Sequence, residues 1–269
     1  MIPPCRAAWL PPMKSRSACS DHPAFGVRPH DDLAAFYEGR EQRARFVARL
    51  FDDTARYYDR ISAALSFGTC KTYRRTALRR AGLEPGMRLL DVATGTGLAA
   101  QAALDLGLPV SAVVGLDPSR GMLEQNQRQR AIPLIQGFGE RLPFRDASFD
   151  FVCMGYALRH VEDLDVLFRE FHRVLRPGGK VLVLEITRPD SRLARAFAAF
   201  YLQRFLPAVV RALTRNAEAG RLLEYYWATI EGCVPPEAIM TVLASSGLTS
   251  VSRHKLGGML SEYSAMKPA

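Results

Sequence analysis

The stretch Asp91-Val-Ala-Thr-Gly-Thr-Gly97 (DVATGTG) is the strongest structural signal in this 269-residue chain. It ends a short apolar run that begins at Arg88, and the turn residues Glu84-Pro-Gly86 come just before that run. Glycines let a backbone turn sharply and approach a ligand closely, and the helix that follows offers unpaired N–H groups. The stretch therefore predicts the end of the first strand of a nucleotide-binding α/β sheet.

Apolar runs with strand character alternate with helical patterns after this motif. Strands are expected at 111–117, 132–136, 149–154, 180–186, 249–256 and 260–266, and helices from Ser119 onward, at 163–175 and at 236–246. The tripeptide Pro177-Gly-Gly179 is interpreted as a turn ahead of its strand. Such alternation predicts an α/β fold in which helices cover both faces of a mostly parallel sheet.

Three segments flank or interrupt this alternating domain, which we place at 83–269. Residues 1–30 carry scattered prolines and are expected to be a disordered tail. Residues 31–82 have an Arg-rich helical pattern and are expected to form an N-terminal helical cover. An amphipathic block at about 190–232 interrupts the alternation and is expected to be an inserted helical lid.

Composition narrows the class of protein. Apolar residues make up 48% and charged residues 23%, which is typical of a globular chain. No stretch approaches the ~20 uncharged apolar residues that a membrane-spanning helix needs. The five cysteines are scattered and form no CxxC pair, which argues against a disulfide framework and a zinc site. We therefore expect no metal and a cytoplasmic protein.

The formal net charge of +9 is compatible with nucleic acid, an anionic membrane surface or an acidic substrate. Part of this charge lies in the predicted cover, at Arg40, Arg43, Arg45, Arg49, Arg74, Arg75, Arg79 and Arg80, and further arginines lie within the predicted lid. Such a cover would suit peripheral contact with the inner face of an anionic membrane. The plain alternative is a solvated basic face.

A second acidic residue sharpens the nucleotide motif. Asp117 ends the next predicted strand, 20 residues beyond Gly97, where its carboxylate can accept hydrogen bonds from both hydroxyls of a ribose. NAD and S-adenosylmethionine both contain such a ribose. Asp91 would sit badly against a pyrophosphate but suits an ammonium group and a sulfonium, so methyl transfer is favoured. The alternatives are that Asp91 caps its own loop and that Asp117 is a solvated strand end or a helix N-cap.

Five further stretches make the sequence resemble the class I methyltransferases and, within them, the C-methyltransferase family of ubiquinone and menaquinone biosynthesis. They are FDDTARYYDRISAALSFG (51–68), VVGLDPSRGML (113–123), GERLPFRDASFDFV (139–152), YALRHV (156–161) and VLRPGGKVLVLE (174–185). The resemblance covers roughly residues 46–267. It implies a Rossmann-like fold with a seven-stranded, mostly parallel sheet, and S-adenosyl-L-methionine as the cofactor.

The resemblance also implies a set of cofactor contacts. The candidate residues are Tyr58, Asp91, Ala93, Gly95, Thr96, Gly97, Asp117, Pro118, Met122, Phe138, Gly139, Glu140 and Gly155. Phe138 and Gly139 stand where the family usually carries Asn or Asp followed by Ala, and Gly155 stands where relatives often have Ser. Phe138 cannot make the family's hydrogen bond to the adenine amino group, but its ring could stack on adenine.

Catalysis is assigned to the pair Arg159-His160, which stands where the resembling family has Arg-Asn. A phenol that loses its proton activates the neighbouring ring carbon, so methyl transfer needs alignment and a proton acceptor. Arg159 is expected to stabilise the phenolate and His160 to act as the base. The structural alternatives are that Arg159 pairs with Glu162 or Asp163 and that His160 caps the next helix.

The leading hypothesis is C-methylation of a phenolic or hydroquinone ring in quinone biosynthesis, on a small, hydrophobic, aromatic and prenylated substrate. One alternative is a C- or O-methyltransferase of another small hydrophobic metabolite, and another is a non-catalytic methyltransferase-like subunit. The predicted lid contains apolar residues at helical spacing, which are Phe197, Phe200, Tyr201 and Phe205. Three alternatives are open for them: they pack on the sheet, they form a wall for a prenyl tail, or they face a membrane. A homodimer or a biosynthetic complex is a further expectation. Nucleic acid is not expected, because no base-flipping motif follows the fourth strand.

Overall fold

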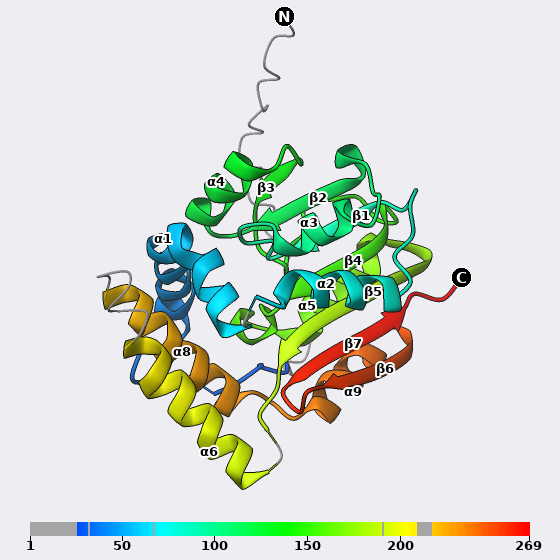
Figure 1. Cartoon of the computed structure of the whole chain (residues 1–269). Helices are drawn as coiled ribbons and strands as arrows, with labels where there is room; N and C mark the ends of the chain where they lie inside the picture. The colour runs from blue at the N-terminus through cyan, green and yellow to red at the C-terminus, as the bar shows by residue number, and fades with distance from the viewer. Residues whose placement is uncertain (1–25, 32, 67, 190, 209–216) are drawn as a thin grey trace, which may run out of the picture.

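The computed structural model describes residues 26–31, 33–66, 68–189, 191–208 and 217–269. Their centre is a seven-stranded sheet in the order β3-β2-β1-β4-β5-β7-β6, in which β7 runs antiparallel to both neighbours and the other pairs are parallel (Figure 1). The strands are β1 Leu89–Val92, β2 Val113–Asp117, β3 Leu134–Gln136, β4 Phe149–Gly155, β5 Leu175–Ile186, β6 Thr249–Leu256 and β7 Leu260–Met266. The predicted fold class is confirmed.

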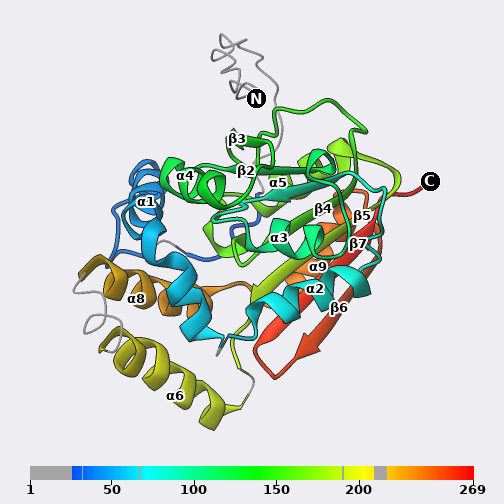
Figure 2. The same cartoon turned by 45° about the horizontal axis from the view of Figure 1, so that its top comes forward.

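Helices cover both faces of this sheet (Figures 1 and 2). The apolar sides of α5 and α9 join one core with the sheet, and those of α2 and α3 join a second core. Because a helical layer covers each face, β1 and β2 are buried along their whole length, as parallel strands between two such layers usually are. The helices are α2 Cys70–Arg80, α3 Leu98–Leu104, α4 Arg120–Gln129, α5 Leu164–Val174 and α9 Pro236–Ser245, with short helices η1 Val110–Ala112 and η2 Leu158–His160.

A third, aromatic core lies beside the sheet and joins three more helices. They are α1 Arg40–Leu65, α6 Arg192–Phe200 with its π-helical continuation η3 Tyr201–Phe205, and α8 Ala217–Gly232. In both views α8 lies between α1 and α6 (Figures 1 and 2). The lid predicted at 190–232 therefore contains α6, η3 and α8, while residues 209–216 lie outside the described residues.

The order of the strands determines where a site can form. β1 pairs with β2 on one side and β4 on the other, so that Asp91 has Gly115 and Cys153 as its neighbours across the sheet. The connections lead away from β1 in opposite directions along the sheet, and the crevice at the carboxyl ends of such strands is where α/β sheets bind ligands. The loops that follow β1, β2 and β4 all open into this crevice.

The strand after α5 differs from its prediction. β5 begins at Leu175, directly after the helix, and contains the Pro177-Gly-Gly179 tripeptide that we interpret as a turn from the sequence. Its pairing with β4 shifts register between Phe149 and Phe151, and Gly178 has a φ of +76°. The tripeptide is therefore accommodated as an irregularity inside the ladder, where glycine tolerates the positive φ.

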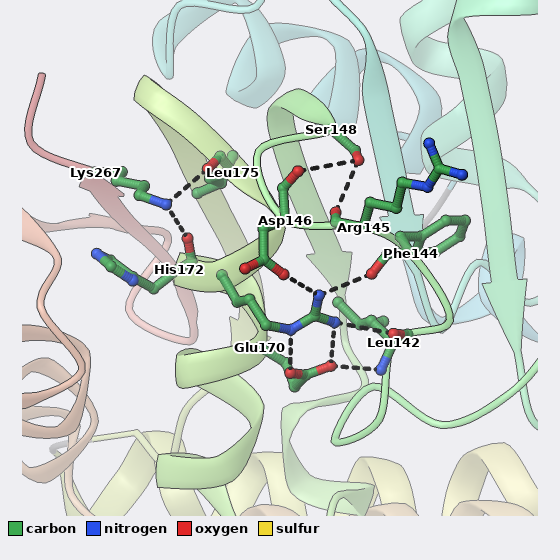
Figure 3. Close-up of polar contacts among 10 residues, drawn as sticks. Leu142, Phe144, Arg145, Asp146, Ser148, Glu170, His172, Leu175 and Lys267 are labelled. Carbon is green, nitrogen blue, oxygen red and sulfur yellow. Dashed lines mark hydrogen bonds and ion pairs between the residues drawn. The ribbon is translucent and has the colours of Figure 1, made fainter.

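A side-chain network fixes the loop between β3 and β4 to α5 (Figure 3). The Arg173 guanidinium donates to both carboxylate oxygens of Glu170, to Asp146 and to the carbonyl oxygens of Leu142 and Phe144. The N–H of Leu142 in turn donates to Glu170 at 2.7 Å. Because this loop continues from the residues after β3, the network holds one wall of the crevice in place.

The structure describes only the last five residues of the predicted tail, 26–30. Residues 1–25 lie outside the described residues, but residues 26–30 pack on the domain. The N–H of Leu164 donates to the carbonyl of Val27 at 2.9 Å, and the N–H of Val234 donates to that of Pro29 at 2.8 Å. His30 is buried, so the expectation of a disordered segment is wrong for 26–30, where these backbone bonds offset the lost chain entropy.

Candidate functional site

Two adjoining cavities lie at the carboxyl ends of β1, β2 and β4. The larger encloses about 280 Å³ and the smaller about 30 Å³. Both are lined by Tyr58, Ala93, Gly95 and Gly155, so these four residues stand where the two cavities meet. The site is therefore one continuous crevice with a large and a small end, covered from above by α1.

The glycine-rich loop has the conformation that its sequence predicts. Gly95 and Gly97 have φ values of +56° and +86°, and a Cβ on Gly97 would lie 2.5 Å from Oδ1 of Asn126. The space around Gly95 and Gly155 is open by comparison, because a Cβ on either residue would meet nothing within 4 Å. Gly95 and Gly97 therefore both allow the turn, and the absence of a side chain at Gly95 and Gly155 leaves open space where the two cavities meet.

Asp117 lies at the end of β2 with its carboxylate turned toward the glycine-rich loop. One oxygen accepts from the N–H of Gly95 at 2.7 Å and the other from the N–H of Ser119 at 2.8 Å. Burial raises the pKa of Asp117 to about 7, although these two hydrogen bonds act in the opposite direction. Each oxygen keeps a further lone pair, so the carboxylate can accept from a ribose.

Asp91 lies at the bottom of the glycine-rich loop and has three hydrogen-bond partners within the chain. Its carboxylate accepts from the hydroxyl of Thr94 at 2.6 Å, from the N–H of Ala100 at 3.1 Å and from the thiol of Cys153 at 3.3 Å. Burial raises its pKa above the ordinary range. Asp91 also lines the small cavity. Its hydrogen bonds hold the glycine-rich loop and the start of α3, which agrees with the alternative that Asp91 caps its own loop.

Arg74 is a residue of the site that sequence reasoning missed. We placed it in a solvent-facing basic cover, but it is 5% exposed and lines the small cavity together with Asp91, Thr94 and Thr96. Its guanidinium lies 4.9 Å from the centre of the Tyr156 ring, and it forms an ion pair with no carboxylate of the described chain. A buried cation without an ion-pair partner suits an anionic ligand group.

The opposite end of the large cavity is apolar. Phe138, Met122 and Pro118 line it, and Phe138 is 54% exposed. Gly139 is required by packing, because a Cβ there would lie 2.6 Å from Cδ1 of Leu167. Glu140 also lines this end and accepts the N–H of Glu162 at 2.8 Å. Every predicted cofactor residue except Gly97 thus lines one of the two cavities.

Helix α1 is fixed over the crevice by two carboxylates. Asp52 accepts from the hydroxyl of Ser119 at 2.6 Å and from the N–H of Gly121 at 2.9 Å, at the start of α4. Asp59 accepts from the hydroxyl of Thr96 at 2.5 Å. The loops after β1 and β2 are thereby tied to the helix that covers them. We make no prediction for Asp52 from the sequence, whereas Asp59 belongs to the stretch Tyr57-Tyr58-Asp59, which we expect from the sequence to close over the methionine end of the cofactor.

His160 lies in the wall of the large cavity. Its ring stacks on Tyr225 at 5.4 Å between centroids, and its Nδ1 lies 3.3 Å from the Tyr225 hydroxyl. Burial, followed by the nearby charge of Arg159, holds the pKa of His160 well below its usual range, so the ring is neutral. Its Nε2 is buried with no hydrogen-bond partner among the described residues. His160 does not cap the next helix, because Asp163 does.

Arg159 points away from this cavity. Its guanidinium forms an ion pair with Glu185 and donates to the hydroxyl of Thr229 at 3.2 Å. Both alternatives that we considered, Glu162 and Asp163, are therefore the wrong partners. Arg43 of α1 holds the same loop from the other side, donating to the carbonyls of Arg159 at 3.1 Å and Val161 at 2.9 Å. A catalytic role for Arg159 stays a prediction, and its contacts are those of a positioning residue.

Three negative findings hold for the described part of the chain. None of its helices combines the length and the apolar content that crossing a bilayer needs. No group of three or more His, Cys, Asp and Glu side chains is arranged to hold a metal ion. Neither α6 nor α8 contributes a lining residue to these two cavities, so a wall of lid residues for a prenyl tail stays a prediction.

Comparison with known sequences gives one consistent group of relatives. The model of the ubiE/COQ5 methyltransferase family matches residues 38–267. A demethylmenaquinone methyltransferase from Parafrankia sp. (strain EAN1pec) is 35% identical over 252 residues, which are 86% of this chain and 97% of the relative. One from Beutenbergia cavernae is 36% identical over 225 residues, which are 83% of this chain and 91% of the relative.

Comparison with solved structures gives the same fold. A methyltransferase from Thermotoga maritima that depends on S-adenosylmethionine aligns with a TM-score of 0.58 at 20% identity, covering 82% of this chain and 99% of that one. A phosphoethanolamine N-methyltransferase from Haemonchus contortus, solved with S-adenosylmethionine, aligns with a TM-score of 0.53 at 19% identity, covering 74% of this chain and 53% of that one. At these identities the likeness concerns the fold alone.

Proposed function

This chain belongs to the ubiE/COQ5 methyltransferase family and is an S-adenosylmethionine-dependent methyltransferase, and from that premise we propose that it C-methylates demethylmenaquinone or a similar polyprenylated hydroquinone. The observation that carries the proposal is a crevice with two chemically different ends around an open centre at Gly155. The small cavity is polar and charged, whereas the large cavity has an apolar part at Phe138 and Met122 and, on its α1 side, further apolar walls beside the neutral His160. Such a pair of ends suits a charged methyl donor and an uncharged aromatic acceptor.

The chain's own residues fit the cofactor. Asp117 would accept the ribose hydroxyls, and the exposed ring of Phe138 would stack on adenine. Arg74 would bind the carboxylate of the methionine end. Bound there, S-adenosylmethionine supplies an electrophilic methyl group. Gly95 and Gly155 leave the space between these contacts clear, because neither has a side chain.

The acceptor would occupy the α1 side of the large cavity. Val47, Phe51 and Val161 form apolar walls there, beside His160. The Tyr225 hydroxyl is also hydrogen-bonded to Arg43, which can only donate, so its own proton is available for Nδ1 of His160. Nε2 then carries the ring proton. In this arrangement His160 donates a hydrogen bond to the oxygen of a phenolate, which favours the ionised acceptor and activates its ring carbon. The phenolic proton passes to water, and water also takes the proton that the methylated ring carbon loses.

This assignment revises the role that we expected for His160. A strongly lowered pKa makes the ring a weak proton acceptor, so it is better suited to hydrogen bonding than to removing the phenolic proton. Among the described residues that line the large cavity, Arg43 is the only arginine. Its positive charge also favours a phenolate. Arg159 contributes by fixing the loop in which His160 stands.

A polyprenyl tail keeps such a substrate in a lipid bilayer, so the proposal includes peripheral contact between the enzyme and a membrane. The test is expression of the chain in a bacterial strain that lacks its quinone C-methyltransferase, with mass spectrometry of the lipid extract. We expect the methylated quinone to return, and we expect Asp117→Ala not to restore it. Unmethylated quinone alone, from a chain that binds S-adenosylmethionine in calorimetry, would mean another small hydrophobic substrate. Absence of cofactor binding would mean a non-catalytic subunit.

A further inference from the structure

The segment formed by α6 and η3 is apolar on two opposite sides. One side is buried, with Ala198, Leu202 and Leu206 only 3–6% exposed in the aromatic core. The other side holds four of the large apolar residues that stand out into solvent: Leu193 is 86% exposed, Phe197 70%, Phe200 60% and Phe205 51%. A helix that is apolar all round normally has a partner on each side, and the described chain covers only one side of this one.

The exposed residues form a continuous face. Leu193, Phe197 and Phe200 follow one another at spacings of four and three, which places them in one row along a helix. Phe197 stacks on Tyr201 at 6.3 Å between centroids, and Tyr201 stacks on Phe205 at 5.8 Å. The wider turn of a π-helix keeps residues four apart nearly aligned, so η3 extends the row. We call Leu193, Phe197, Phe200, Tyr201 and Phe205 the aromatic face.

The charged residues within the segment itself have one sign. Residues 192–205 contain Arg192, Arg195 and Arg204 and no Asp or Glu. Arg195 forms an ion pair with Glu231 of α8, whereas Arg192 and Arg204 are exposed. Two copies of the chain packed face to face would bring these like charges together. A surface that combines an apolar interior with negatively charged groups would complement both properties.

We propose that the aromatic face is a docking site for an anionic lipid bilayer. Phenylalanine and leucine side chains would enter the boundary between headgroups and acyl chains, while Arg192 and Arg204 would contact lipid phosphates. This placement takes up the membrane-facing alternative that the sequence offers for the lid, and it relies less on the arginines of the N-terminal cover. Arg43 and Arg74 of that set are buried, and Arg80 forms an ion pair with Glu262.

The aromatic face is connected to the substrate cavity through a single core. Leu202 and Leu206, on the buried side of the segment, belong to the same cluster as Tyr225, which stacks on His160. Docking would therefore hold the cavity close to the bilayer from which a prenylated acceptor is taken. That consequence rests on the proposed function, whereas the docking itself rests on the face and its charges.

The test is co-sedimentation of the full chain with vesicles of phosphatidylcholine, alone and mixed equally with phosphatidylglycerol. We expect binding to the mixed vesicles that weakens at high salt. The double variant Phe197→Ser/Phe200→Ser should bind roughly tenfold less tightly or weaker, because two aromatic anchors are lost. Val166→Ser, which removes a 40%-exposed apolar residue on α5, should bind like the parent. Both variants should keep their affinity for S-adenosylmethionine, since neither changes a cavity residue.

Three results would overturn the proposal. They are no binding to either vesicle, unchanged binding of the double variant, and a dimer in light scattering that the double variant abolishes without vesicles. The last would identify a second copy of the chain as the occupant of the face. Vesicle binding by a protein that fails to restore quinone methylation would reject the proposed function and leave the docking site standing.

Discussion

The guanidinium of Arg159 forms an ion pair with the carboxylate of Glu185 where the two side chains are 1% and 0% exposed. Arg159 stands in η2, directly before His160, and Glu185 lies near the end of β5. Glu185 also accepts the N–H of Arg159 at 3.3 Å and that of Ile186 at 2.7 Å. The pair therefore fixes the loop that carries His160 to the sheet, which explains why a charged residue next to the cavity faces away from it.

Breaking this pair should destabilise the protein strongly. Arg159→Met leaves a buried carboxylate without its counter-ion, and we expect the free energy of unfolding in guanidinium chloride to fall by about 3–5 kcal/mol. Adding Glu185→Leu should restore a large part of that loss, because both charges are then absent. Arg169→Met, which removes an exposed ion pair with Asp165, is the matched control and should cost about 1 kcal/mol or less. Equal losses for the two single variants would contradict the positioning role.

His160 should act without changing its charge. His160→Ala should lower kcat by roughly tenfold to a hundredfold, since a hydrogen bond to a charged oxygen is lost. His160→Asn, which restores the family's residue and keeps a donor, should retain most of the activity. Because the pKa of His160 lies well below its usual range, the pH profiles of kcat for parent and Asn variant should match between about pH 6 and pH 8. His172→Ala, outside the site, serves as the control.

Cofactor affinity should depend on pH through Asp117. Ribose hydroxyls donate to the ionised carboxylate, and its pKa is about 7 in the ligand-free protein. The Kd for S-adenosylmethionine should therefore fall roughly tenfold as the pH rises from about 6 to about 8. Asp117→Asn should bind weakly with no such dependence. Calorimetry at a series of pH values measures both, and a flat Kd for the parent would contradict the assignment.

The same carboxyl affects stability with the opposite sign. Its pKa is raised in the folded state, whereas an unfolded aspartate titrates near 3.9. Between about pH 4 and about pH 7 the folded protein binds one proton at Asp117 that the unfolded chain has lost. The stabilisation that this proton gives is therefore fully present below about pH 4 and is lost as the pH rises through about 7. Unfolding of Asp117→Asn in guanidinium chloride over this range should show a smaller pH slope than the parent.

Arg74 should recognise the amino-acid end of the cofactor. Arg74→Met should raise the Kd for S-adenosylmethionine by roughly tenfold to a hundredfold, the range of a charge-assisted hydrogen bond. Adenosine lacks that end, so its Kd should stay unchanged in the variant. Arg75→Met is a matched control, because Arg75 is the next residue and is exposed. A variant that loses both ligands equally would point to damage to the fold instead.

Most of the sheet follows from the sequence because its strands are short, apolar and separated by helical patterns. Asp117 and Gly95 could be placed for the same reason, since a motif at the end of a strand lies at the ligand-binding edge of a parallel sheet. The Pro177-Gly-Gly179 tripeptide was misplaced because turn residues also form irregularities within a ladder. A local pattern cannot distinguish the two cases.

The residues missed in the site share one property, which is that their partners are distant in the sequence. Arg43 and Arg74 stand in helices dense with arginine, where a solvent-facing position is the usual one, and burial becomes visible only when α1 and α2 pack on the sheet. The partner of Arg159 is also distant, because Glu185 lies in β5, 26 residues further along the chain. Glu162 and Asp163 are nearer in the chain, but the loop turns the guanidinium toward β5.

A stacking contact between Phe138 and adenine should replace the hydrogen bond that the family's Asn or Asp makes to the adenine amino group. The family usually has Asn or Asp at this position, whereas the exposed Phe138 ring lines the apolar end of the cavity beside Met122. Stacking of a base on an aromatic ring is worth about 1–3 kcal/mol, so Phe138→Ala should raise the Kd for S-adenosylmethionine by roughly fivefold to a hundredfold. Phe138→Tyr keeps the ring and should bind like the parent.

Phe205→Ala removes a ring of similar exposure that does not line the cavity, and it controls for the loss of an exposed aromatic side chain. If Phe138→Asn bound the cofactor more tightly than the parent, a hydrogen bond to adenine would outweigh the stacking, and this chain's departure from its family would have weakened cofactor binding.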